Sequence, residues 1–237
     1  MSPSHTVVLV HGAWHGAWCF AALQHALDEL GVPSYAIDLP GHGSSLLPLG
    51  DLHADAAHVA DVLDRIDGPV VLVGHSYGGA VISQAAADRP NVSHLVYLAA
   101  FALHAGESVM TLLRSMPPAA VGLGAAMRPL DDGTTVLDPT LAAPALYGDC
   151  PAPAVSAALA RLSPQPTATM VQTADASALG ATPSTYVVCL RDDAVHPAHQ
   201  TIMAERCTFS TTFDCDHSPF LSRTADTAEL LHRLAAS

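Results

Sequence analysis

The segment from Pro69 to Asp88 constrains the fold more than any other. A run of apolar residues, Pro69–Val73, leads directly into GHSYGG and then into a stretch typical of a helix. A strand this apolar is expected to be buried on both faces of a parallel sheet. Gly74, Ser76 and Gly78 fit the pattern G-x-S-x-G, in which small neighbours allow a serine to occupy a sharp strand-to-helix turn. The segment therefore predicts a parallel α/β sheet with the Ser76 hydroxyl exposed at a turn.

The rest of the chain alternates in the same way between short apolar runs and helical segments, which indicates βαβ units. Strands are predicted at Thr6–Val10, Ser34–Asp38, Pro69–Val73, His94–Ala99, Thr185–Leu190 and Cys207–Phe213. Helices are predicted at Ala17–Leu30, Leu52–Ile66, Gly78–Asp88 and Ala225–Ala235. The predicted fold class is therefore α/β, with a six-stranded, mainly parallel, doubly wound sheet in one domain over residues 1–237.

Residues 105–166, which we call the cap segment, break this alternation. The segment is rich in proline, and Asp132-Gly133 is typical of a hairpin turn. A structureless loop of this length is unusual inside a compact domain. We therefore predict an insertion that covers the carboxyl edge of the sheet; the alternative is a long surface excursion without a function.

Composition and charge exclude several classes of protein. Hydrophobic residues make up 50% of the chain and charged residues 13%, which predicts a large core rather than disorder. The net charge of −13 repels nucleic acids and anionic membranes, so neither is an expected partner. The five cysteines form no CxxC pair, and no leader peptide or membrane span is apparent. These features predict free thiols and a cytoplasmic location.

The first predicted strand ends in the sequence VLVHGAWHGAW. Ligands of open α/β sheets bind beyond the carboxyl ends of the strands, so this loop is expected to pass near Ser76. The backbone N–H groups of Ala13 and Tyr77 are then candidate donors to an oxyanion. Trp14 is a candidate for lining a pocket, with simple packing as the alternative, whereas His15 is expected to be incidental.

A serine nucleophile needs a base and an orienting carboxylate. His217 follows the last predicted strand, in the loop FDCDHSPF, and is the expected base. The carboxylate is expected after the strand TYVVCL, where Asp192 is preferred from the chain order and Asp193 is a rival from local sequence. Asp214 and Asp216 lie too close to His217 in the chain to support its ring, and we expect them to be solvated.

The motifs VLVHGAWHGAW, DLPGHG, GHSYGGAV, RDDAVHPAHQ and DHSPFLS together resemble the plant methylesterase and hydroxynitrile lyase branch of the α/β hydrolases, with its bacterial esterase relatives. The resemblance spans nearly the whole chain. In that branch the catalytic acid lies eight positions before a glutamine. Counting back from Gln200 gives Asp192 (200 − 8 = 192), so the resemblance implies Asp192 rather than Asp193.

Two positions depart from the lyase pattern of this branch. The lyases carry a threonine after the histidine of the first motif and a lysine after the catalytic histidine, where this chain has Gly12 and Ser218. A serine cannot supply the positive charge that stabilises leaving cyanide. The resemblance therefore implies an esterase, and its lyase branch becomes less favoured.

The sequence thus predicts a serine esterase acting on a small, largely apolar ester, such as a methyl ester, through Ser76, His217 and Asp192, with no metal or cofactor. The alternatives are a lactone-opening or C–C lyase enzyme with the same triad, or a non-catalytic ligand-binding protein on this scaffold. Besides Trp14, the residues expected to line the substrate pocket are Leu103, Met110 and Leu146. For each of these three residues, core packing is the alternative. The substrate and the oligomeric state stay open.

Overall fold

A parallel six-stranded sheet forms the centre of the computed structural model, which describes residues 5–236. Its strands, in the order β2-β1-β3-β4-β8-β9, all run parallel to their neighbours. Their bounds are β1 (Thr6–Val10), β2 (Ser34–Ile37), β3 (Val70–His75), β4 (Val92–Leu98), β8 (Ser184–Cys189) and β9 (Phe209–Phe213). The predicted fold class is confirmed, and all six predicted strands are present.

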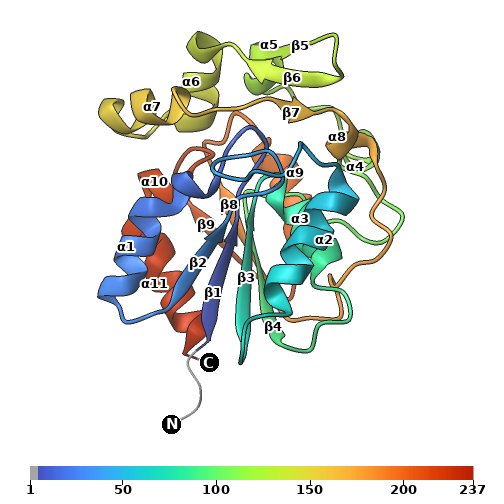
Figure 1. The fold of residues 1–237 in the computed structure, drawn as a ribbon. Coiled ribbons are helices and arrows are strands. Elements are labelled where there is room, and N and C mark those ends of the chain that lie inside the picture. The colour runs from blue at the N-terminus through green and yellow to red at the C-terminus, as the bar shows by residue number, and fades with distance from the viewer. Residues whose placement is uncertain (1–4, 237) are drawn as a thin grey trace.

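Helices cover both faces of this sheet (Figure 1). One face carries α1 (Ala21–Glu29), α10 (Pro219–Ser222) and α11 (Thr224–Ala235). The other carries α2 (Leu52–Leu63), α3 (Gly78–Ala85) and α9 (Pro197–Ala204). The first predicted helix is split, because residues Ala17–Phe20 form a short 3₁₀ turn before α1 begins.

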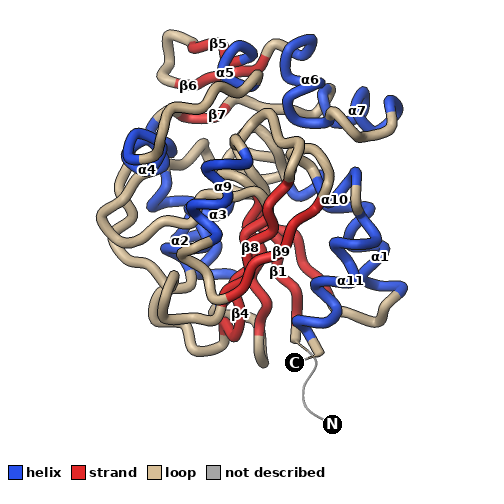
Figure 2. The backbone as a smooth tube through the Cα atoms, turned by 180° about the vertical axis from the view of Figure 1, so that it is seen from behind, coloured by secondary structure: helices blue, strands red, loops and turns tan. Residues whose placement is uncertain are grey.

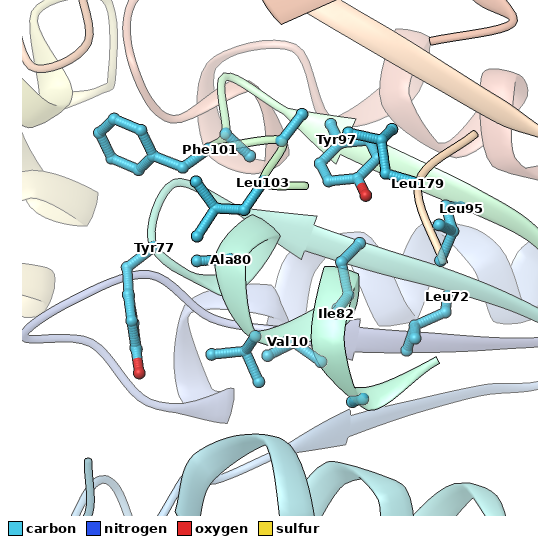
Figure 3. Packing of buried hydrophobic residues seen from close by; sticks show 14 of the residues in the cluster. Val10, Leu72, Tyr77, Ala80, Ile82, Leu95, Tyr97, Phe101, Leu103 and Leu179 are labelled. Atoms are coloured by element: carbon cyan, nitrogen blue, oxygen red, sulfur yellow. The ribbon is translucent and has the colours of Figure 1, made fainter. Parts of the chain in front are cut away.

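The core consists of two apolar clusters separated by the sheet. Successive residues of β1 alternate between them: Val7 and Leu9 pack under α1 and α11, while Val8 and Val10 pack under α2 and α3. Figure 3 shows part of the second cluster, in which Leu103 packs among residues of β4 and α3. Burial on both faces explains why the central strands are almost continuously apolar.

The cap segment lies above the carboxyl ends of the strands in both views of the chain (Figures 1 and 2). The predicted hairpin at Asp132-Gly133 is confirmed, since β5 and β6 pair antiparallel around Gly133, whose φ is +81°. A third short strand, β7, pairs with the other edge of β6. The elements of this region are α4 (Val109–Ser115), α5 (Leu123–Ala126), β5 (Met127–Pro129), β6 (Thr134–Leu137), α6 (Pro139–Tyr147), α7 (Ala152–Leu159), β7 (Gln165–Pro166) and, just beyond it, α8 (Ala168–Val171).

Several strand boundaries differ from the prediction by one or two residues, and two of the differences have clear local reasons. β4 begins two residues early, at Val92, because this end of the strand pairs with Val70 of β3. β9 begins two residues late, because Cys207 N–H bonds to Ala204 O and so belongs to the turn after α9. Within residues 5–236, no helix is long and apolar enough to cross a membrane.

Candidate active site

Ser76 lies in the turn between β3 and α3. Its φ of +51° is in the left-handed region, which is unusual for a residue other than glycine. The two flanking glycines allow this turn, because a Cβ at Gly74 would lie 2.5 Å from Gly78 O, and one at Gly78 would lie 2.5 Å from Val10 O. The strained turn leaves Ser76 partly exposed between two buried neighbours.

His217 and Asp192 form a buried pair at the same edge of the sheet. His217 Nδ1 lies 2.7 Å from Asp192 Oδ2, and the exposed fractions of the two side chains are 1% and 0%. Asp193 points elsewhere: it is exposed and accepts a hydrogen bond from Gly122 N. Of the two adjacent aspartates, Asp192 is therefore the one that orients the His217 ring.

Gln200 explains the spacing used to select Asp192. Its Nε2 donates to Asp192 Oδ2 at 2.7 Å, and its Oε1 accepts from Cys189 N at 2.9 Å. The eight-residue separation thus reflects a contact between the loop after β8 and the first turns of α9. In the sequence, Gln200 served only as the reference position for the count. Its role in holding Asp192 follows from its burial, because a buried amide is normally hydrogen-bonded.

His75 links the serine turn to the His217 loop. His75 Nε2 donates to His217 O at 2.9 Å, and the two rings lie 4.5 Å apart. Burial lowers the pKa of His75 well below its usual value, so the ring is neutral. No hydrogen bond joins Ser76 Oγ to His217 among the described residues; such contacts are often long without bound substrate.

Ala13 and Tyr77 carry the two expected oxyanion donors. Neither backbone N–H donates a hydrogen bond to another described residue, and both residues are buried. The Tyr77 side chain points away from Ser76 toward α2, where its hydroxyl donates to Asp55 Oδ2 at 2.7 Å. Burial raises the pKa of the Asp55 carboxyl to about 7, so its proton is held far more strongly than that of an ordinary aspartate.

A cavity of about 190 Å³ opens beside Ser76. Its other lining residues are apolar or glycine: Ala13, Trp14, Phe101, Val109, Met110, Leu113, Val121, Leu123, Gly124, Met127, Met170, Ala194 and Val195. Trp14 and Met110, both selected from the sequence, lie in this wall. A neighbouring cavity of about 400 Å³ reaches the exposed Arg114 and shares five lining residues with the first: Phe101, Leu113, Val121, Ala194 and Val195.

Leu103 and Leu146 are corrections, because neither lines this cavity. Leu103 is wholly buried in the core against α3, as Figure 3 shows, and Leu146 packs inside the cap segment with Tyr147. An apolar side chain that fills a core and one that lines a pocket have the same local sequence pattern. Both leucines therefore fill a core, which was the alternative left open by the sequence.

His15 and Asp216 also differ from the prediction, because both are buried and hydrogen-bonded. His15 is buried and bridges the loop after β1 to the cap segment, with Nδ1 2.8 Å from Ala13 O and Nε2 2.7 Å from Tyr147 Oη. Burial lowers its pKa to about 4, which keeps the ring neutral. Asp216 is likewise buried rather than solvated, and its carboxylate accepts from Asp149 N at 3.0 Å and Ser222 Oγ at 2.6 Å.

Comparison with known proteins identifies relatives of this chain. Residues 7–230 match the model of the alpha/beta hydrolase family. The chain belongs to that family. It is 42% identical to the carbendazim hydrolyzing esterase of Nocardioides sp. in an alignment 118 positions long, which covers 47% of this chain and 48% of that protein. It is 27% identical to Methylesterase 18 of Arabidopsis thaliana across 98% of both chains.

The fold of this alpha/beta hydrolase is also close to that of a solved relative. The pyrethroid hydrolase of Sphingobium faniae JZ-2 superposes with a TM-score of 0.84 at 25% identity, over 98% of both chains. The resemblance to methylesterases and bacterial esterases is therefore confirmed. The chain nevertheless aligns with only about half, or less, of the first curated relatives it matches. Among residues 5–236, no group of three or more His, Cys, Asp or Glu side chains is arranged to hold a metal ion.

Proposed function

We propose that this protein is a serine esterase that hydrolyses a carboxylic ester of a small, largely apolar molecule. The observation that carries the proposal is the position of Ser76. Its hydroxyl stands at the wall of an otherwise apolar cavity, on the same edge of the sheet as the buried His217–Asp192 pair. The relatives named as an esterase, a methylesterase and a pyrethroid hydrolase support this reaction class.

In the proposed first step, Ser76 Oγ attacks the ester carbonyl carbon while His217 Nε2 takes the hydroxyl proton. Asp192 holds His217 Nδ1–H and stabilises the imidazolium that forms. The carbonyl oxygen becomes an oxyanion and accepts hydrogen bonds from the N–H groups of Ala13 and Tyr77. When this intermediate collapses, the bond to the leaving oxygen breaks and His217 returns the proton to the alcohol.

In the second step, water repeats the sequence on the acyl-enzyme. His217 removes a proton from water, the resulting hydroxide attacks the acyl carbon, and Ser76 leaves with the proton from His217. The products are a carboxylic acid and an alcohol. All proton transfers thus pass through one histidine, whose orientation is fixed by the buried Asp192.

The cap segment is proposed to close over the substrate and to bind its carbon skeleton. Several apolar side chains of the cavity wall come from this segment, among them Met110, Leu123 and Met127. Each apolar methylene that they remove from water contributes about 0.8 kcal/mol. An uncharged wall next to the serine favours a neutral ester, such as a methyl ester, over a substrate charged near its carbonyl.

We also propose that the protein works in the cytoplasm. All five cysteines are free, and three of them, Cys19, Cys189 and Cys215, are buried, which is typical of a reducing compartment. The negative net charge is consistent with a small molecule, rather than a nucleic acid or a membrane, as the partner.

Two measurements test the proposed function. A fluorophosphonate probe should label the wild-type protein at Ser76, and the purified protein should hydrolyse p-nitrophenyl acetate. The Ser76→Ala variant should take no label and should lose about 10⁴-fold or more in kcat while keeping its circular dichroism spectrum. A folded Ser76→Ala protein with a tenth of the wild-type activity would exclude Ser76 as the nucleophile.

A further inference from the structure

The turn at Ala13–Trp14 is held from the cap segment. Trp14 N donates to Gln165 Oε1 at 3.0 Å, and Trp14 O accepts from Ser163 N at 2.9 Å. The Trp14 indole Nε1 donates to Thr135 O at 3.1 Å. The backbone donor, the backbone acceptor and the side-chain donor of Trp14 are therefore all bound by one inserted segment.

Trp14 needs this support because its backbone is strained. Its φ of +63° is in the left-handed region, which is rare for a bulky residue and persists only where the surroundings fix it. Without the contacts from the cap segment, the turn is expected to relax. The neighbouring Ala13 N–H, which belongs to the same turn, would then move relative to Ser76.

The amide of Gln165 is itself fixed in one orientation. Gln165 is buried, and its Nε2 donates to Thr169 Oγ1 at 3.0 Å. Thr169 Oγ1 already gives its proton to Pro166 O at 2.6 Å, so it can only accept from Gln165. The carbonyl oxygen of the amide is thereby directed to Trp14 N, and this contact occupies the Trp14 N–H while the Ala13 N–H stays free.

We infer that Gln165 is a positioning residue for ester hydrolysis, which fixes the strained Ala13–Trp14 turn so that the Ala13 N–H meets the oxyanion. The inference rests on the proposed function. It means that the cap segment sets the geometry of the transition state in addition to enclosing the substrate. Loss of Gln165 should therefore lower kcat rather than raise KM, because an oxyanion donor acts mainly in the transition state.

The test compares Gln165→Met with wild type on one p-nitrophenyl ester. Loss of one oxyanion donor typically costs about 10²–10³-fold in kcat, and a KM within about threefold is expected. Affinity for phenylboronic acid should fall in proportion to kcat. In that adduct Ser76 Oγ bonds to boron and its proton passes to His217, which gives an anionic tetrahedral boronate that needs the same donors. A purely structural role would lower thermal stability but leave kcat and the boronic acid affinity unchanged.

Gln172→Met is the matched control. Gln172 also accepts from a backbone N–H, that of Leu52, and donates to a side chain, that of Asp51, but neither of these partners belongs to the oxyanion turn. Its kcat should stay within about twofold of wild type. Gln165→Glu should restore most of kcat at pH 6, because a buried carboxyl stays protonated and then offers the same acceptor and donor as the amide.

The outcomes separate the inference from the proposed function. If the wild-type protein hydrolyses no ester, the proposed function fails. If wild type is active and folded Gln165→Met keeps its kcat, only the role of Gln165 fails. If Gln165→Met does not fold, Thr169→Val takes its place, because it removes the contact that orients the Gln165 amide. A loss of about tenfold or more in kcat of that variant would support the inference. An unchanged kcat would overturn it.

Discussion

Gln200 Nε2 donates a 2.7 Å hydrogen bond to Asp192 Oδ2, the oxygen that also binds His217 Nδ1. The other oxygen, Oδ1, accepts from the backbone N–H groups of Ala194 at 2.7 Å and Val195 at 2.8 Å. Four donors therefore surround a carboxylate that is removed from water. A buried charge needs such compensation, and the arrangement leaves the carboxylate no freedom to turn away from the histidine.

Asp192→Asn should cost about 10⁴-fold in kcat. The amide would present either an N–H or a weaker acceptor to His217 Nδ1, which favours the wrong tautomer of the ring. Asp193→Asn is the matched control, since Asp193 is exposed and its carboxylate accepts from Gly122 N rather than from His217. Steady-state kinetics of both variants checks this, and the opposite ranking would show that Asp193 orients the base.

The residues recovered from the sequence share one property: their signal is local. Ser76 lies between two glycines at the end of an apolar run, and the sheet follows from such runs. The contact between Trp14 and Gln165, by contrast, joins residues 151 positions apart, and nothing in the sequence near either residue indicates that contact. Leu103 and Leu146 failed as pocket residues for the same reason, because the side of an apolar residue that meets a cavity depends on packing between distant segments.

Asp55→Asn should stabilise the protein increasingly as the pH rises from about 4 to 7. Burial raises the pKa of the folded-state carboxyl from 3.8 to about 7, so over this range the folded state holds a proton that the unfolded state has lost. The free energy of unfolding of wild type therefore falls with rising pH, by at most about 4 kcal/mol from this group, and the decline ends above pH 7. The asparagine variant does not lose stability in this way, because its residue 55 carries no ionisable group.

Urea unfolding of wild type and Asp55→Asn at pH 5, 6, 7 and 8 measures that difference. Asp61→Asn is the control, since Asp61 is exposed on the same helix and should change stability little at any of these pH values. A difference between wild type and Asp55→Asn that stays constant with pH would mean that the Asp55 carboxyl ionises as readily in the folded state as in the unfolded state.

The size of the cavity at Ser76 should set a chain-length optimum. Across a series of p-nitrophenyl esters, kcat/KM should rise about fourfold per methylene while the apolar wall is being filled, and then fall. Leu113 is one of the residues that line both the cavity of about 190 Å³ and the neighbouring one of about 400 Å³. Leu113→Ala should therefore move the optimum to longer chains, whereas Leu141→Ala, at an exposed position of α6, should not. An optimum that is the same in Leu113→Ala would mean that substrates do not occupy this cavity.

Hydrolysis is expected in preference to cyanohydrin cleavage. Both reactions use a serine, a histidine and an aspartate, so the triad does not distinguish them. The difference lies in the charge that must be stabilised: hydrolysis develops an oxyanion, whereas cleavage also releases cyanide, which requires a nearby cation. The chain contains no lysine, and Ser218 stands directly after His217. The cavity beside Ser76 is lined by no arginine or histidine among the described residues, whereas Arg114 lines the neighbouring cavity.

Gly12 favours the same reaction, because it keeps the space above the nucleophile open. A Cβ at this position would lie 2.9 Å from Ser76 Cβ and 3.0 Å from His75 Nδ1, so a threonine would crowd the serine. We therefore expect hydrolysis of p-nitrophenyl acetate or a methyl ester, and no release of cyanide from mandelonitrile above the rate in buffer. Gly12→Thr should lower the esterase rate without creating cyanide release, since it adds no cation. Saturable cyanide release by wild type that disappears in Ser76→Ala, in the absence of esterase activity, would identify the protein as a lyase.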